Sequence, residues 1–234
     1  GIKEHLESAA EKLATQWLAD HQVAIKSLND ERQDVYRQIR EMSTDPLDVE
    51  LAQPNTWLQA TKVRDPNGTE TDLPLFENHL MCDENGLFPE HFNAWERKVI
   101  DSELARDETV AWYRNPARAS QDSLGVTYED GDDVSIVRPD FVFFAKLDDV
   151  SYAAEIVDPH GRQFADALPK LKGLARYAEV NGGYYRRIEV VSELDGTYRV
   201  LDLKDEETRN AVAGLSASSA RSLYEGTAAR DYLA

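Results

Sequence analysis

The chain has 234 residues, 44 acidic and 26 basic, so its formal net charge is −18 and its length allows one or two domains. A hydrophobic share of 41% supports one sizeable core, and no apolar run approaches the ~18 residues that cross a bilayer, which excludes disorder and a membrane partner. A single cysteine, Cys82, excludes an internal disulfide framework and favours a cytoplasmic, reducing compartment.

Residues 1–45 are predicted to form an N-terminal helical segment. Apolar residues recur at steps of three and four from Ile2 to Trp17 and from Leu28 to Met42, which is the spacing of one helix face. Asn29-Asp30 is expected to break the helix in two. Because an apolar stripe of this length must be buried against something, we expect this segment to contact a second copy of the chain or another domain.

Residues 46–90 are predicted to be a connector. Five prolines and the turn signal Asp65-Pro-Asn-Gly68 fall in or beside this stretch, and such residues are typical of loops rather than regular structure.

Residues 91–234 are predicted to be an α/β domain in which helices flank a mixed central sheet. A helix should begin at Asn93, because Asn93 and Glu96 have the spacing of a capping box. Strands are then expected over 110–113, 123–128, 134–144 and 151–157. A helix over 169–180 follows, then strands over 187–192 and 197–203 joined by the turn Glu193-Leu-Asp-Gly196, then a helical tail.

Two isolated carboxylates, Asp140 and Glu155, lie in apolar strand segments that a short turn joins. A buried carboxylate destabilises the fold unless it is solvated, paired or bound to a metal. Residues 127–158 contain nine acidic and two basic residues, whereas residues 160–190 contain three acidic and six basic. The pattern favours a Mg²⁺ or Mn²⁺ site held by Asp140 and Glu155, beside a helix that could contact phosphates.

These motifs resemble a known family. Glu96 in a helix, a strand ending in Tyr128, then Pro139-Asp140, then Glu155 after a hairpin resemble the restriction-endonuclease-like PD-(D/E)xK nuclease core. The runs Asn93-Ala-Trp-Glu-Arg-Lys-Val, Trp112-Tyr-Arg-Asn-Pro, Arg138-Pro-Asp-Phe and Asp158-Pro-His-Gly are similar to the C-terminal region of helicases related to type III restriction subunits. The resemblance implies a metal-dependent DNA nuclease in which Asp140 and Glu155 bind the metal and Glu96 orients the site.

The chain departs from the family pattern at one position. The pattern expects a lysine two residues after the glutamate, to stabilise charge in the transition state, and this chain has Val157 there. Two residues could replace the lysine: Lys170 in the following helix, or His160. Lys170 is the favoured transition-state cation, because it lies in the first turn of that helix and nearer its buried face than Lys172.

Other interpretations of the same residues stay open. Glu96 also fits a plain helix cap, and Asp158-Pro-His160 also fits a tight turn with a hydrogen-bonded histidine. The whole domain could be a degenerate nuclease fold that serves docking or dimerisation, or, from its charge alone, an acidic mimic of DNA. No Gly-x-x-x-x-Gly-Lys-Ser/Thr loop occurs, so this chain alone cannot be an ATP-driven motor. A helicase partner in a restriction or phage-defence system is therefore expected upstream of residue 1.

Overall fold

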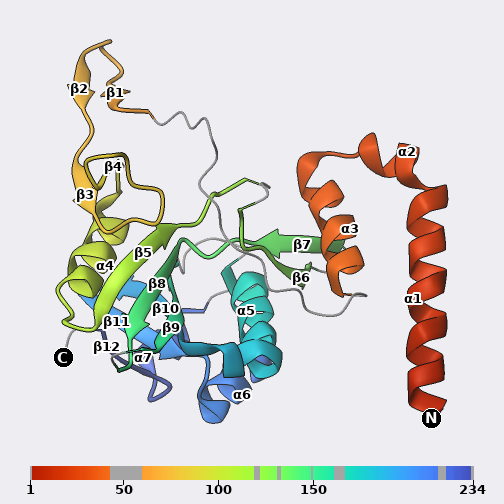
Figure 1. Ribbon diagram of the computed structural model, residues 1–234. Coiled ribbons are helices and arrows are strands. Elements are labelled where there is room, and N and C mark those ends of the chain that lie inside the picture. Colours follow the sequence, from red (N-terminus) through yellow and green to blue (C-terminus); the bar gives the residue numbers. More distant parts are fainter. Residues whose placement is uncertain are drawn as a thin grey trace.

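The computed structural model describes residues 2–42, 60–118, 122–130, 133–148, 150–160, 167–215 and 220–232 (Figure 1). Its helices are α1 (Ile2–Asp20), α2 (Gln22–Lys26), α3 (Asp30–Met42), α4 (Ala94–Leu104), α5 (Ala167–Asn181), α6 (Glu206–Gly214) and α7 (Arg221–Glu225), with a 3₁₀ turn at Gly182–Tyr184. Its strands are β1 (Lys62–Arg64), β2 (Glu70–Asp72), β3 (Leu75–Glu77), β4 (Leu87–Pro89), β5 (Thr109–Arg114), β6 (Val126–Asp130), β7 (Asp133–Val137), β8 (Phe141–Lys146), β9 (Tyr152–Pro159), β10 (Tyr185–Leu194), β11 (Thr197–Asp202) and β12 (Ala229–Asp231).

A six-stranded mixed sheet forms the centre of the α/β domain, in the order β12-β11-β10-β9-β8-β5. β9 and β10 are parallel, and α5 is the helix of the crossover between them; the other neighbouring pairs are antiparallel. Helices cover both faces: α4 packs on one, and α5, α6 and α7 contribute to the core on the other. The predicted α/β class with a mixed central sheet is therefore confirmed.

The two faces of the sheet bury different kinds of side chain. On the face toward α4 the core is largely aromatic, with Trp112, Phe141 and Phe143 fully buried. On the other face it is largely aliphatic, with Ile156 and Ile188 beneath the helices. Each such side chain stabilises the fold by about 1.5–3 kcal/mol, so both layers are needed to hold the strands in register.

Two local predictions are confirmed by the backbone and its hydrogen bonds. Asn93 Oδ1 accepts hydrogen bonds from the backbone N–H groups of Trp95 and Glu96, and the Glu96 carboxylate accepts from Asn93 N–H, which completes the capping box of α4. In the β10–β11 turn, Asp195 and Gly196 have φ values of 51° and 87°, the left-handed conformation that the tight hairpin turn requires.

The prediction that residues 46–90 are a connector without regular structure is wrong for the part that the structure describes. Residues 60–90 contain two short hairpins, β1–β2 and β3–β4. The turn signal at Asp65-Pro-Asn-Gly68 was correctly located, and it joins β1 to β2. Phe76 and Phe88 of the second hairpin are buried in the aromatic core, so this hairpin belongs to the domain. Residues 46–59 lie outside the described part.

The single strand expected over 134–144 is divided at Arg138-Pro139-Asp140. Before this point β7 pairs with β6 in a separate hairpin, and after it β8 enters the central sheet. The β6–β7 hairpin lies against α5, where a Cβ atom on Gly173 would be only 2.4 Å from Cβ of Tyr128. Because Pro139 has no N–H to donate, it suits the break, and the break places Asp140 at the start of β8.

The N-terminal helices are joined to the α/β domain through α3. The predicted break at Asn29 is confirmed, and its side chain accepts a hydrogen bond from the N–H of Arg32. Figure 1 shows α1 standing apart from the sheet, while α3 lies beside β7. Asp34 and Arg138, both nearly fully buried, form an ion pair with Nη2–Oδ2 at 2.5 Å. No helix in the described ranges is long and apolar enough to cross a membrane.

The C-terminal region is helical as expected over α6 and α7, but it also contains an unpredicted edge strand, β12. This strand pairs with β11 and is only three residues long. Ala229 of this strand and Tyr232, which follows it, are buried. β12 is therefore the edge strand on this side of the sheet, and buried side chains anchor it.

Candidate functional site

Two carboxylates meet where β8 begins and β9 ends. Phe141 pairs with Val157 in the antiparallel register, so Asp140 lies opposite Asp158. The backbone N–H of Asp140 donates to Asp158 Oδ1 at 2.9 Å. Asp158 is buried and Asp140 is half-buried. The sheet therefore holds an aspartate pair at this end, with one member open to solvent.

Arg114, at the end of β5, links this aspartate pair to α4. Its guanidinium is 3.2 Å from Asp140 Oδ1 and 2.5 Å from Glu96 Oε1. It lies over the Phe141 ring, 4.9 Å from the centroid. Glu96 Oε2 meanwhile accepts the Asn93 N–H at 2.9 Å. Glu96 thus caps α4 and also contacts Arg114, and its role in orienting a metal site stays a prediction.

His160 completes the cluster from the other side of Asp158. Its Nδ1 is 3.3 Å from Asp158 Oδ2, and its backbone N–H donates to Val191 O at 2.8 Å. Among the five residues predicted for the site, the structure therefore brings together Glu96, Asp140 and His160. Asp158 and Arg114 join them, although neither was predicted as a site residue.

The pKa of Asp140 is raised to about 7. Burial is the largest cause, followed by the neighbouring charge of Asp158; Arg114 and His160 act in the opposite direction, and Glu96 adds a smaller increase. Around Asp140 the carboxylates of Asp158 and Glu96 are accompanied by one guanidinium, that of Arg114.

Glu155 does not lie in this cluster. It pairs with Phe143, and because side chains alternate along a strand it points to the α4 face, away from Asp158. Its carboxylate is fully buried and forms ion pairs with Arg186 Nε and, at 2.5 Å, Arg187 Nη2. The geometry does not support the prediction that Asp140 and Glu155 hold one metal ion, because two arginines already neutralise Glu155.

These ion pairs belong to a wider buried network on the α4 face. Arg187 also contacts Glu103 Oε2 at 2.5 Å and Glu189 Oε2 at 2.9 Å. Arg186 reaches Glu108 at 3.0 Å, and the Tyr232 hydroxyl donates to Glu103 at 2.6 Å. The network ties α4, β9 and β10 to the end of the chain, so its role is structural.

Val157 is fully buried in the aromatic core. Lys170 lies half-buried in the first turn of α5, the helix that follows β9 in the chain. The assignment of Lys170 as the transition-state cation stays a prediction.

Asp140 and Asp158 are the carboxylates of this cluster that could hold a metal ion, because carboxylate oxygens are the ligands that Mg²⁺ and Mn²⁺ prefer. Within the described residues, however, no group of three or more His, Cys, Asp and Glu side chains is arranged to hold a metal. Arg114 Nη1 contributes positive charge beside Asp140 instead.

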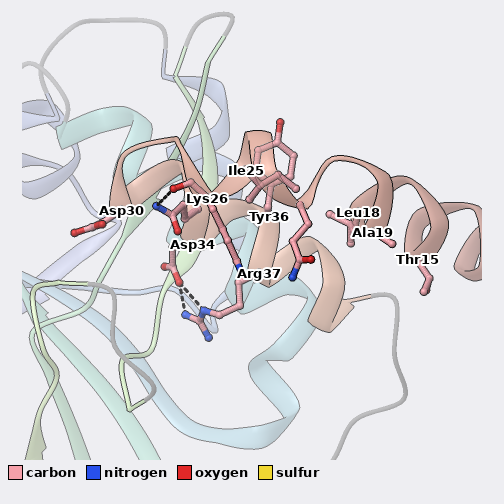
Figure 2. Close-up of a pocket in the computed structure, with 11 residues that line it drawn as sticks. Thr15, Leu18, Ala19, Ile25, Lys26, Asp30, Asp34, Tyr36 and Arg37 are labelled. Carbon is pink, nitrogen blue, oxygen red and sulfur yellow. Dashed lines mark hydrogen bonds and ion pairs between the residues drawn. The ribbon is translucent and has the colours of Figure 1, made fainter.

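A separate cleft of about 710 Å³ lies between α1, α2 and α3. Figure 2 shows its lining, in which Leu18, Ile25 and Tyr36 supply apolar surface and Arg37 pairs with Asp34. This cleft is lined by the N-terminal helices alone and contains none of the residues of the aspartate pair.

The fold and the strand-end cluster define a mixed α/β protein with an acidic site between two antiparallel strands. The chain belongs to the YagJ family, whose family model matches residues 77–233. It is 46% identical over 231 residues to Protein YagJ of Escherichia coli (strain K12), an alignment that covers 99% of this chain and 93% of the relative. No solved structure matches the chain. Neither name states an activity.

Proposed function

We propose that this chain is a Mg²⁺- or Mn²⁺-dependent DNA nuclease with a restriction-endonuclease-like core, and that its metal-binding carboxylates are Asp140 and Asp158. The PD-(D/E)xK pattern requires a helix glutamate, an aspartate after proline at a strand start, and a strand carboxylate followed two residues later by a lysine. Glu96, Asp140 and Asp158 supply the three carboxylates, and His160 stands at the position of the lysine. The carboxylate motif is thus shifted by three residues from Glu155.

The observation that carries the proposal is the contact between Asp140 and Asp158. The Asp140 N–H donates to the Asp158 carboxylate at 2.9 Å, and the pKa of Asp140 is raised to about 7. Two adjacent carboxylates that are undercompensated by positive charge are stabilised by a divalent cation. Glu155 differs in this respect, because two arginines pair with it, whereas the single Arg114 serves both Asp140 and Glu96.

Each residue of the cluster would then have a distinct role in phosphodiester hydrolysis. Asp140 and Asp158 would hold the ion, which when bound polarises the phosphoryl oxygens and lowers the pKa of the attacking water. His160 takes the place of the missing lysine and, through Nδ1, fixes the orientation of Asp158. Arg114 is positioned by Glu96 to stabilise negative charge that develops on the phosphate. Lys170 is a second candidate for that last role.

DNA as substrate and a helicase partner in restriction or phage defence follow from the resemblance. With a net charge of −18, the chain can bind DNA only through a local basic surface. Arg114 and His160 beside the aspartates, together with Lys170 and Lys172 of α5, are our candidates for such a surface. A cytoplasmic location is part of the same proposal.

The test is to replace each aspartate by asparagine and to measure cleavage of DNA with Mg²⁺ and with Mn²⁺. Asp140→Asn and Asp158→Asn should each lower cleavage about 100-fold or more, since each removes one charged ligand. Asp195→Asn, in the exposed β10–β11 turn, is the matched control and should cleave like the unaltered chain. Unchanged cleavage in both site variants would exclude the assignment.

A second candidate is a degenerate nuclease fold that serves docking or dimerisation. It is favoured by the Arg114 guanidinium, which already lies between Glu96 and Asp140 and supplies the positive charge that a metal would bring. Calorimetric titration with Mn²⁺ distinguishes the two. Absence of both metal binding and cleavage in the unaltered chain would favour the docking function, with the α1–α3 cleft as its surface.

A further inference from the structure

Three buried polar atoms lie near Asp158, on the sheet face that α5, α6 and α7 cover. They are His160 Nε2, Ser192 Oγ and Tyr224 Oη, and none has a hydrogen-bond partner among the described residues. Ser192 and Tyr224 are each only 1% exposed. Buried polar atoms are nearly always hydrogen-bonded to protein or to ordered water, because an unpaired one destabilises the fold.

The register of the parallel strands brings two of these residues together. Asp158 pairs with Val190, and His160 N–H donates to Val191 O, so Ser192 lies beside His160 at the ends of β9 and β10. Positions 158, 160, 190 and 192 have the same parity and point to the same face. Asp158, His160 and Ser192 therefore share one corner of the sheet.

Tyr224 approaches this corner from α7, which packs on β10 and β11. Burial and then the nearby charge of Asp158 raise the pKa of the Tyr224 hydroxyl, which places the two groups near one another. The ring lies in an aliphatic core with Ile156 and Ile188. A phenylalanine would fill this space equally well without burying a hydroxyl, so the hydroxyl requires a polar partner.

We propose that Ser192 and Tyr224 are positioning residues that hold Asp158 and His160 through ordered internal water. A buried water molecule typically makes about three hydrogen bonds to polar groups that lack other partners, and these side chains supply such groups. Asp158 Oδ1 accepts from Asp140 N–H, and Oδ2 faces His160 Nδ1. Donors behind the carboxylate would fix its remaining lone pairs, and water can bond to His160 Nε2. Only the catalytic role of this network rests on the proposed function; the network itself does not.

The sign of a stability change tests the network. Tyr224→Phe and Ser192→Ala remove single hydroxyls, and unfolding in urea measures the effect. If the hydroxyls are bound to internal water, each change should raise the unfolding equilibrium constant about fivefold, as loss of a typical hydrogen bond does. Tyr177→Phe is the matched control for the loss of a hydrogen-bonded hydroxyl, because the Tyr177 hydroxyl is hydrogen-bonded to that of Tyr185 at 2.8 Å. Unchanged or increased stability in both test variants would overturn the proposal.

A double-mutant cycle tests the connection to Asp158. In an Asp158→Asn background, Tyr224→Phe should have a clearly smaller effect on the unfolding constant than in the unaltered chain, because the two groups share one network. In DNA cleavage, Tyr224→Phe should lower kcat about tenfold and leave KM unchanged. Additive stability changes would overturn the inference whether or not the chain cleaves DNA. Coupled stability changes without any cleavage would retain the network and exclude the nuclease function.

Discussion

Glu155→Gln should destabilise the fold, although the sequence predicts this carboxylate to be a metal ligand. Glutamine keeps the size of the side chain and removes its charge. The Glu155 side chain is 0% exposed, and Arg186 and Arg187 lose one anionic partner each. Removing one partner of a buried ion pair generally costs about 3–5 kcal/mol, because the other charge stays buried.

The lower end of this range applies here. Arg187 keeps its contacts with Glu103 and Glu189, and Arg186 keeps its contact with Glu108, so neither guanidinium is left without an anion. A loss of about 3 kcal/mol raises the unfolding equilibrium constant roughly 100-fold. This expectation differs from that for a metal ligand, whose removal relieves repulsion and leaves stability level or higher.

Urea unfolding followed by tryptophan fluorescence, to which buried Trp112 contributes, measures the change, and an unchanged m value would support the two-state analysis. The control is Glu225→Gln, in an exposed pair with Arg221 on α7, which should change the midpoint little. If Glu155→Gln matched this control, Glu155 would not hold the buried network together. It would again be a candidate metal ligand.

Two further predictions concern Asp140 and the N-terminal helices. The pKa of Asp140 is raised from 3.8 to about 7, so the folded chain binds its proton more tightly than the unfolded chain, and stability falls as pH rises through this interval. In thermal unfolding, the Asp140→Asn variant should therefore be more stable than the unaltered chain above pH 7, and the two should be about equally stable below pH 3.8. A stability difference between them that stays constant with pH would contradict this prediction. Asp34→Asn should cost about 3 kcal/mol in urea unfolding, because it leaves Arg138 buried without its 2.5 Å partner. A loss below about 1 kcal/mol would show that α3 is not anchored by this pair.

Local signals in the sequence predicted most elements of the α/β domain. The capping box at Asn93 located α4, and Asp195-Gly196 located the β10–β11 turn, because both depend on residues close in sequence. The strand β12 was missed because its three residues are stabilised by pairing with β11, a contact that no local pattern indicates. The hairpin β3–β4 was missed for a similar reason, since burial of Phe76 and Phe88 comes from the domain core.

The residues of the candidate cluster were predicted in part, and strand register explains why Asp158 rather than Glu155 lies beside Asp140. In an antiparallel pair the residue numbers of partners have a constant sum, so the pairing of Phe143 with Glu155 also sets Asp158 opposite Asp140. The arginines that neutralise Glu155 come from β10, whose parallel register with β9 depends on the α5 crossover and cannot be read from local spacing.

The ion pair between Asp34 and Arg138 joins two parts of the chain that are 104 positions apart. Arg138 is followed directly by Pro139 and Asp140, and the Pro139 carbonyl is held by the Asn115 side chain at 2.7 Å. The family model matches residues 77–233, so Arg138 lies within the matched region and Asp34 lies outside it. A ligand that binds α3 by competing for Asp34 would loosen Arg138, which is two residues before Asp140. If this changes the affinity for a ligand at Asp140 by some factor, thermodynamic reciprocity requires that the ligand at Asp140 change the affinity at α3 by the same factor.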